Sequence, residues 1–275
     1  MATTLRIYQV DAFSSALFAG NPAAVVLLET ALPDAVMQQI AAENNLSETA
    51  FLCPASTAAR AEADFSLRWF TPTHEVALCG HATLASAWVL MNAGLWPQPT
   101  VRFATRSGIL EAHHAGDDIR IDLPARDSTP DTPPEELRQG LGQPPRSVRS
   151  GANWIAIYDD EETVRALRPD FAALARLHPR GVIVTAPGRD SDIVSRYFVP
   201  SFGIDEDPVT GSAHCDLAPF WCAHFGRDAL SARQLSSRGG ALTLRWDRDS
   251  GRVHLEGQCA LYLSGWIHLP ETAAR

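Results

Sequence analysis

The stretch Arg68-Trp69-Phe70-Thr71-Pro72-Thr73 has a counterpart 128 residues later, Arg196-Tyr197-Phe198-Val199-Pro200-Ser201. In both places a short run of strand-forming residues ends at a turn that contains a proline. A glycine motif follows each copy and opens an apolar stretch of helical length: Gly80-His81-Ala82 in the first and Gly211-Ser212-Ala213 in the second, 131 residues apart. The sequence therefore predicts two copies of a strand–turn–helix unit.

A third match extends the repeat toward the N-terminus. Asn21 opens the apolar run 22–28, and Asn153, 132 residues later, opens the run 154–158. Three matches that keep their order and nearly constant spacing favour an internal duplication over chance similarity. Strands and helices do not alternate regularly as in a doubly wound parallel sheet, so we predict an α+β fold of two similar halves.

The predicted halves are residues 1–125 and 126–275, with the active site between them; the last strand can pack back on the first half. The remaining predicted elements are strands 6–13, 23–28, 50–53, 65–70, 241–246, 252–256 and 260–269, and helices from Pro33, over 81–92 and around 134–140 within a linker, 125–145. The second glycine motif poses a difficulty, because Pro219 cannot donate a hydrogen bond inside a helix. We expect a kink there, or a helix that begins only near Asp216.

Composition limits the possible functions. The 275 residues, 45% of them hydrophobic, are enough for two domains with proper cores. A net charge of -9 argues against nucleic acid or an anionic membrane as the main partner. All 23 basic residues are arginines, which excludes a lysine Schiff base to pyridoxal phosphate, a P-loop lysine and a lysine nucleophile.

The cysteines and the N-terminal residues indicate a cytoplasmic protein. The five cysteines are scattered, without the close pairs of a zinc site. No stretch approaches the ~20 apolar residues of a membrane span, and the first 13 residues lack the apolar run of a signal peptide.

The repeated glycine motifs are the first candidate binding features. A helix that starts at Gly80 or Gly211 leaves backbone N–H groups pointing outward, and these attract anions with help from the helix dipole. The pair predicts a small carboxylate substrate, although tight structural turns would give the same pattern. His81 lies at one helix start, where the dipole favours the neutral imidazole.

Carboxylates are the next candidates. Asp205, Glu206 and Asp207 precede the second glycine motif, and their crowding would raise at least one pKa if they were partly buried. Asp207 is the best placed, since Pro208 fixes the chain after it; a solvated acidic turn is the alternative. Glu48 stands before a strand, but position alone does not distinguish it from other glutamates such as Glu43 and Glu75.

Five motifs in chain order resemble the phenazine-biosynthesis isomerase family, which shares the fold of diaminopimelate epimerase. The resemblance runs from about residue 5 to residue 269 and rests on Tyr8-Gln9-Val10-Asp11-Ala12-Phe13, Gly20-Asn21-Pro22, Asn45-Leu46-Ser47-Glu48-Thr49-Ala50-Phe51, Cys79-Gly80-His81-Ala82-Thr83 and Asp207-Pro208-Val209-Thr210-Gly211-Ser212-Ala213. It implies two halves, each a curved, mostly antiparallel sheet around a central helix. It also implies a homodimer that uses neither a cofactor nor a metal.

The same resemblance implies roles for individual residues. Glu48 matches the family's essential glutamate, which shuttles a proton between ring carbons of a dihydro-hydroxyanthranilate, while His81 and Asp207 orient the substrate. The implied substrate-binding residues are Asn21, Gly80, Thr210, Gly211 and Ser212. The resemblance indicates the type of reaction and leaves the physiological substrate open.

Two alternatives compete with a glutamate-dependent isomerase. A two-cysteine racemase would use Cys79 and a second thiol at the repeated position, but that position is Thr210, and Cys215 lies about one turn later. A non-catalytic binder of small carboxylates could use the same residues. Replacing Glu48 by Gln separates catalysis from binding, because a binder needs no proton shuttle.

Overall fold

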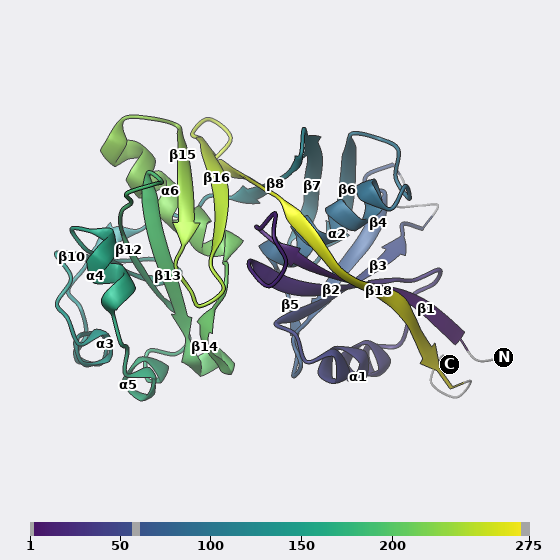
Figure 1. The fold of residues 1–275 in the computed structure, drawn as a ribbon, viewed down its shortest axis with the longest axis horizontal. Helices are drawn as coiled ribbons and strands as arrows, with labels where there is room; N and C mark the ends of the chain where they lie inside the picture. Colours follow the sequence, from purple (N-terminus) through teal and green to yellow (C-terminus); the bar gives the residue numbers. More distant parts are fainter. Residues whose placement is uncertain (1–2, 57–60, 271–275) are drawn as a thin grey trace. The chain divides into compact units, whose positions relative to one another are not determined.

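The computed structural model describes residues 3–56 and 61–270. The chain divides into two compact units, unit 1 (Met1–Asp122 and Glu256–Arg275) and unit 2 (Leu123–Leu255). The sequence placed the division near residue 125 and allowed the last strand to return to the first half. In the structure strand β18 (Cys259–Leu269) pairs antiparallel with β1 (Thr3–Ala12); the two lie side by side in Figure 1, drawn in yellow and purple.

In unit 1 a sheet curves around a single buried helix. Helix α2 (Gly80–Asn92) packs against β1, β2 (Asn21–Leu27), β3 (Glu48–Pro54), β7 (Gly108–Ala115) and β18. A helix covered on several sides must be apolar on several sides, as the burial of residues 80–87, 89 and 90 shows. The helices are α1 (Asp34–Asn44) and α2 (Gly80–Asn92). The other strands are β2 (Asn21–Leu27), β3 (Glu48–Pro54), β4 (Phe65–Phe70), β5 (Glu75–Val76), β6 (Thr100–Thr105), β7 (Gly108–Ala115) and β8 (Asp118–Pro124), whose last two residues belong to unit 2.

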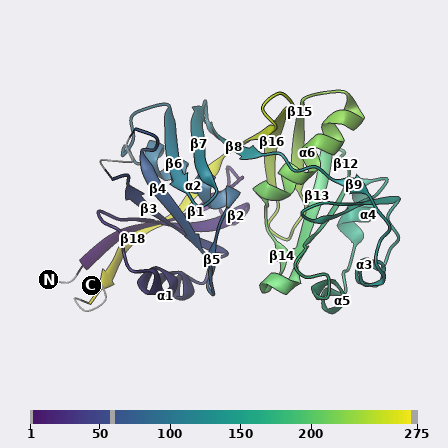
Figure 2. The same cartoon turned by 180° about the vertical axis from the view of Figure 1, so that it is seen from behind.

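Unit 2 has the same plan around α6 (Gly211–Phe225), of which nine residues are buried. Its strands are β9 (Thr129–Pro130), β10 (Ser147–Ser150), β11 (Trp154–Ile157), β12 (Val182–Pro187), β13 (Ile193–Val199), β14 (Ile204–Asp207), β15 (Ala229–Gln234), β16 (Gly240–Asp247) and β17 (Arg252–Gly257), which ends in unit 1. Short helices complete it: α3 (Glu135–Leu141), α4 (Glu161–Ala166), α5 (Phe171–Ala175) and the 3-10 turn Pro200–Phe202. Figure 2 shows α3, α4 and α5 on the outside of the unit 2 sheet.

The two units pair their strands in the same pattern. In unit 1 the pairs β1–β2, β3–β4, β4–β5 and β6–β7 are antiparallel and β2–β3 and β4–β6 are parallel. In unit 2 the pairs β10–β11, β12–β13, β13–β14 and β15–β16 are antiparallel and β11–β12 and β13–β15 are parallel. The predicted fold of two similar, mostly antiparallel halves, each around a central helix, is confirmed.

Helix α6 corrects one expectation from the sequence. It begins at Gly211 and continues through Pro219, so a start near Asp216 was wrong. Proline at this position deprives the Cys215 carbonyl of its helical donor. The backbone N–H of Arg126 donates to that carbonyl at 3.1 Å, and the replacement bond lets the helix run on uninterrupted from the glycine motif.

All five cysteines, which lie within the described residues, are free thiols. Among residues 3–56 and 61–270, none of the helices has the length and apolar character needed to cross a membrane.

Candidate active site

The first residue of the site, Asn21, is positioned by a glycine. Gly20 has a φ of +69°, and a Cβ there would lie 2.3 Å from the backbone oxygen of Ala12. Only glycine fits such a close approach in this conformation. The tight turn brings the chain into β2 at Asn21, whose side chain is completely buried.

Glu48 is positioned by the end of α1. Asn45 caps this helix with a left-handed φ of 49°, a conformation that Asn tolerates better than most residues. The side-chain amide of Asn44 then donates to Thr49 Oγ1 at 3.1 Å. β3 begins at Glu48, opposite Ala23 of the parallel strand β2, so the ends of the two strands lie together and Asn21 and Glu48 reach the same region.

His81 completes the cluster from α2. Its imidazole is 4% exposed, and burial lowers its pKa to about 3, since a charged ring would lose its hydration. His81 is therefore neutral at physiological pH. Its Nε2 lies 3.3 Å from Glu48 Oε2.

A chain of side-chain contacts sets the tautomer of His81. Ser47 Oγ donates to Asn21 Oδ1 at 3.4 Å, which turns the amide nitrogen of Asn21 toward His81 Nδ1, 3.2 Å away. An amide NH₂ can only donate, so Nδ1 accepts and the single ring proton sits on Nε2. The neutral histidine consequently carries its proton on the ring nitrogen nearer Glu48, although the 3.3 Å contact between Nε2 and Glu48 Oε2 lacks the alignment of a hydrogen bond.

Cys79 is the third polar group beside His81. Its Sγ lies 3.5 Å from His81 Nδ1, on the side of the ring away from Glu48. Glu48, Cys79 and His81 have ligand atoms within 4.8 Å of one another, so these three residues have the spacing of a metal-binding set as well. Cys79 and Glu48 therefore lie at opposite ring nitrogens of His81, and the Glu48 carboxylate is the acidic group beside Nε2.

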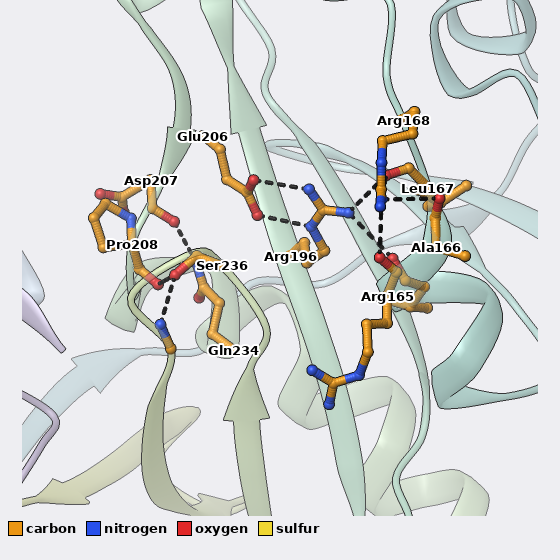
Figure 3. Close-up of polar contacts among 12 residues, drawn as sticks. Arg165, Ala166, Leu167, Arg168, Arg196, Glu206, Asp207, Pro208, Gln234 and Ser236 are labelled. Atoms are coloured by element: carbon orange, nitrogen blue, oxygen red, sulfur yellow. Dashed lines mark hydrogen bonds and ion pairs between the residues drawn. The ribbon is translucent and has the colours of Figure 1, made fainter. Parts of the chain in front are cut away.

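In unit 2, Asp207 belongs to a different, densely bonded cluster. Thr210 Oγ1 donates to Asp207 Oδ2. Gln234 of β15 donates from Nε2 to the Asp207 carbonyl at 2.7 Å and accepts at Oε1 from the Thr210 N–H at 2.9 Å. Ser236 Oγ donates to the Pro208 carbonyl at 2.7 Å, so two residues of the β15–β16 region fix the segment that leads into α6 (Figure 3).

The three acidic residues before the second glycine motif do not converge. Along β14, Asp205 is exposed and Asp207 is buried, while Glu206 accepts two bonds of 2.8 Å from Arg196. Figure 3 shows Glu206 and Asp207 directed to different partners. The crowding expected from the sequence is therefore absent among these three residues.

The repeat explains both Glu206 and Glu75. Arg68 binds Glu75 through two bonds of 2.7 Å, as Arg196 binds Glu206 in the other unit. Trp69 pairs with Val76 in the first unit and Tyr197 pairs with Asp207 in the second. Val76 and Asp207 therefore occupy equivalent positions, so Asp207 is a side chain that unit 2 has at this position and unit 1 lacks.

Both central helices start without a side-chain cap. The residues before them, Cys79 and Thr210, are extended and make no side-chain capping bond. Gly80 and, in the other unit, Gly211 and Ser212 thus provide first-turn N–H groups, which have no acceptor within the helix. Each start has the local geometry for binding a carboxylate.

Cys215 does not take the place of a second catalytic thiol. It lies inside α6, where its Sγ contacts the Gly211 carbonyl at 3.6 Å. Burial raises the pKa of this thiol to about 12, which suppresses the thiolate. The two-cysteine mechanism has no second thiolate at this position.

Three positioning residues were not predicted from the sequence. Ser47 orients Asn21, Gln234 ties Asp207 to Thr210, and His214 bridges the Thr210 carbonyl at 2.8 Å and Ser195 Oγ at 3.3 Å. Ser47 stands in a motif beside Glu48, and that adjacency was its one signal. Gln234 and His214 carry no sequence signal, because each acts through contacts that only the fold creates.

Comparison with known proteins gives a consistent result. A model of the "Phenazine biosynthesis-like protein" family matches residues 10–265. An uncharacterized isomerase of Pseudomonas aeruginosa is 48% identical over 96% of this chain and 99% of its own length. The crystal structure of a PhzF-family phenazine biosynthesis protein from Enterococcus faecalis matches with a TM-score of 0.91 at 42% identity, covering 97% of this chain and 100% of that one.

A more distant likeness concerns the fold alone. A hydroxyproline epimerase from Agrobacterium vitis matches with a TM-score of 0.62 at 13% identity, over 98% of this chain and 94% of its own. This likeness supports the fold expected from the resemblance to diaminopimelate epimerase.

Proposed function

The chain belongs to the PhzF-type, phenazine biosynthesis-like family of isomerases, and we propose that it moves a proton within a small carboxylate substrate, with Glu48 as general acid and base. The observation that carries the proposal is the chain of contacts Ser47–Asn21–His81, which assigns the proton of the neutral imidazole to Nε2, 3.3 Å from Glu48 Oε2. A proton shuttle needs such a group, held in place and largely shielded from water.

The proposed reaction conserves atoms and electrons. The Glu48 carboxylate removes a proton from one substrate carbon, and the electron pair of the broken C–H bond enters an adjoining π system. The carboxylic acid then returns the proton to another carbon of the same molecule. Glu48 ends as it began, so this sequence of steps consumes no co-reactant; the dihydro-hydroxyanthranilate of the family serves as the reference substrate.

His81 acts on Glu48 and on the substrate. A neutral N–H donor can orient one carboxylate oxygen without neutralising the base by an ion pair. The other assigned residues remain proposals from the family motif: Asp207 orients polar groups of the substrate, and Asn21, Gly80, Thr210, Gly211 and Ser212 bind it.

Deuterium exchange tests the proposal. The purified protein is incubated in heavy water with the reference substrate and a panel of small unsaturated carboxylates, and incorporation is followed by mass spectrometry. Glu48→Gln should lower the exchange rate by about 10²–10⁴-fold, the usual contribution of a general acid–base group, while binding persists. Glu43→Gln, an exposed change on neighbouring α1, is the matched control and should exchange like the unaltered protein.

Two results would reject the proposal. Exchange that survives Glu48→Gln would assign the proton transfer to another group, and a complete lack of exchange with bound ligands would leave a carboxylate-binding protein. Asp207→Asn tests the orienting role, since it should raise KM and lower kcat even though Glu48 is intact.

We also propose, from the family resemblance, a homodimer in the cytoplasm. Unit 1 presents a group of exposed apolar side chains suited to self-association: Phe18, Leu261, Tyr262, Leu263 and Trp266. Light scattering on the purified chain distinguishes one copy from two.

A further inference from the structure

A second group of metal-ligating side chains lies in unit 1, on strands that carry none of the proposed catalytic residues. Glu111 and His113 are two residues apart on β7, so their side chains lie on the same face of the sheet. His113 pairs with Arg120 of β8, and extending this register by two residues along β8 places Asp122 opposite Glu111. Glu111, His113 and Asp122 have ligand atoms within 4.8 Å of one another.

The two distances from His113 to the carboxylates match those of a metal's first coordination shell. His113 Nε2 lies 3.6 Å from Glu111 Oε2 and 3.6 Å from Asp122 Oδ2. Nitrogen and oxygen ligands bound tetrahedrally to Zn²⁺ at about 2.0–2.2 Å are separated from one another by about 3.3–3.6 Å. The same separation is longer than a good hydrogen bond.

An outer contact orients the histidine for this role. Thr100 of β6, which pairs with His113, has its Oγ1 at 3.0 Å from His113 Nδ1. When Nδ1 carries the ring proton and donates it to Thr100, the lone pair of Nε2 faces the two carboxylates. Metal-binding histidines are commonly held by a partner at the other ring nitrogen in this way.

Arginines of the neighbouring strands lie beside this group. Arg102 pairs with Glu111 across β6–β7 and contacts Asp64 at 3.2 Å. Arg120 pairs with His113 across β7–β8 and lies 3.9 Å from Glu256. The spacing of the ligand atoms, and not an excess of negative charge, is therefore the feature that favours a cation here.

We propose that Glu111, His113 and Asp122 form a binding site for a divalent transition metal, with Zn²⁺ as the reference ion. Thr100 is the positioning residue, and water completes the coordination, because the Glu111 side chain is 45% exposed. The ion joins β7 to β8 just before the chain leaves unit 1 at Asp122. This site goes beyond the proposed isomerase function and does not depend on it.

The test is a Zn²⁺ titration of the full chain, followed by calorimetry and by thermal unfolding. Cys79→Ser is used as the background, so that the group Glu48–Cys79–His81 is deprived of its thiolate. We expect one ion bound per chain with micromolar affinity and a higher melting temperature. His113→Gln should abolish both effects, and Thr100→Val should weaken binding by about 10- to 100-fold.

Further variants and a second metal keep the outcome clear. Glu111→Gln alters a half-exposed side chain and should weaken binding without unfolding the protein, which circular dichroism verifies. Co²⁺ is also added to the protein that retains Cys79. A thiolate-to-cobalt charge-transfer band there would show that the metal binds at Glu48–Cys79–His81 and not at Glu111–His113–Asp122. Binding unchanged by His113→Gln and Glu111→Gln, or no binding below millimolar Zn²⁺, would overturn the proposal and leave a histidine–carboxylate ion-pair cluster.

Discussion

At the scale of single residues, the candidate site depends on a proton that is placed by a neighbour. Asn21 can only donate to His81 Nδ1 through its amide nitrogen, and this forces the ring proton onto Nε2, 3.3 Å from Glu48. The orientation of Asn21 is in turn set by Ser47. The ring nitrogen that holds the His81 proton beside Glu48 therefore depends on Ser47, which takes no part in the contact between His81 and Glu48.

Changing Asn21 to Asp should reverse the tautomer. A carboxylate accepts, so His81 would place its proton on Nδ1 and withdraw the N–H from Glu48. We expect kcat for solvent exchange to fall by about 10²-fold or more, in line with a wrong histidine tautomer in other enzymes. Nitrogen NMR of labelled histidine would show the proton move from Nε2 to Nδ1. Asn92→Asp, exposed at the end of α2, is the control; an unchanged tautomer in Asn21→Asp would refute the relay.

At the scale of secondary-structure elements, the same arginine–glutamate ion pair recurs at equivalent positions of the two units. Arg68–Glu75 joins β4 to β5 and Arg196–Glu206 joins β13 to β14. Arg196 is 11% exposed and also donates to the Leu167 carbonyl at 3.0 Å, as Figure 3 shows. These pairs hold the strands that precede the two glycine motifs, which is a structural task, and it explains why acidic residues gather there.

Arg196→Met should therefore destabilise the protein strongly. It leaves the Glu206 carboxylate, 18% exposed, without its two donors, and a stranded, largely buried charge costs about 3–5 kcal/mol. Urea unfolding measures the loss. Arg189→Met is the control, since its pair with Glu162 is 69% and 77% exposed and such pairs contribute about 0–1 kcal/mol. Equal losses in the two variants would mean that the Arg196 pair is no more than a surface contact.

At the scale of the whole molecule, the repeat predicted the architecture, and side-chain chemistry remained hidden. Matching positions such as Asn21 and Asn153, or Gly80 and Gly211, established two similar halves because scaffold positions repeat. Glu48 was found through the family motif alone, since one glutamate before a strand resembles any solvated charge.

What the sequence could not supply comes from contacts between distant segments. Gln234 meets Thr210 across 24 residues, and no local pattern marks that meeting. Pro219 misled the prediction of a helix start, because the donor that replaces its missing N–H belongs to Arg126 in a separate segment. Periodicity and spacing describe elements, while these contacts exist only after the elements have packed.

The return of the chain to unit 1 leads to a prediction about folding. β18 pairs with β1 from Thr3–Leu269 to Ala12–Cys259 and packs on α2, whereas unit 2 is one continuous stretch with its own core. Ending the chain after Gln258 should expose the edge of β1 and one side of α2. We expect amide hydrogens of β1, β2 and α2 to exchange at least about 10²-fold faster, since local opening free energies fall where packing is lost, while those of β12, β13 and α6 keep their protection.

A chain ending after Leu269 retains β18 and is the control. Simultaneous loss of protection in both units would show that they unfold as a single cooperative body, and the duplication would then describe the ancestry of the chain and not its independent stability units.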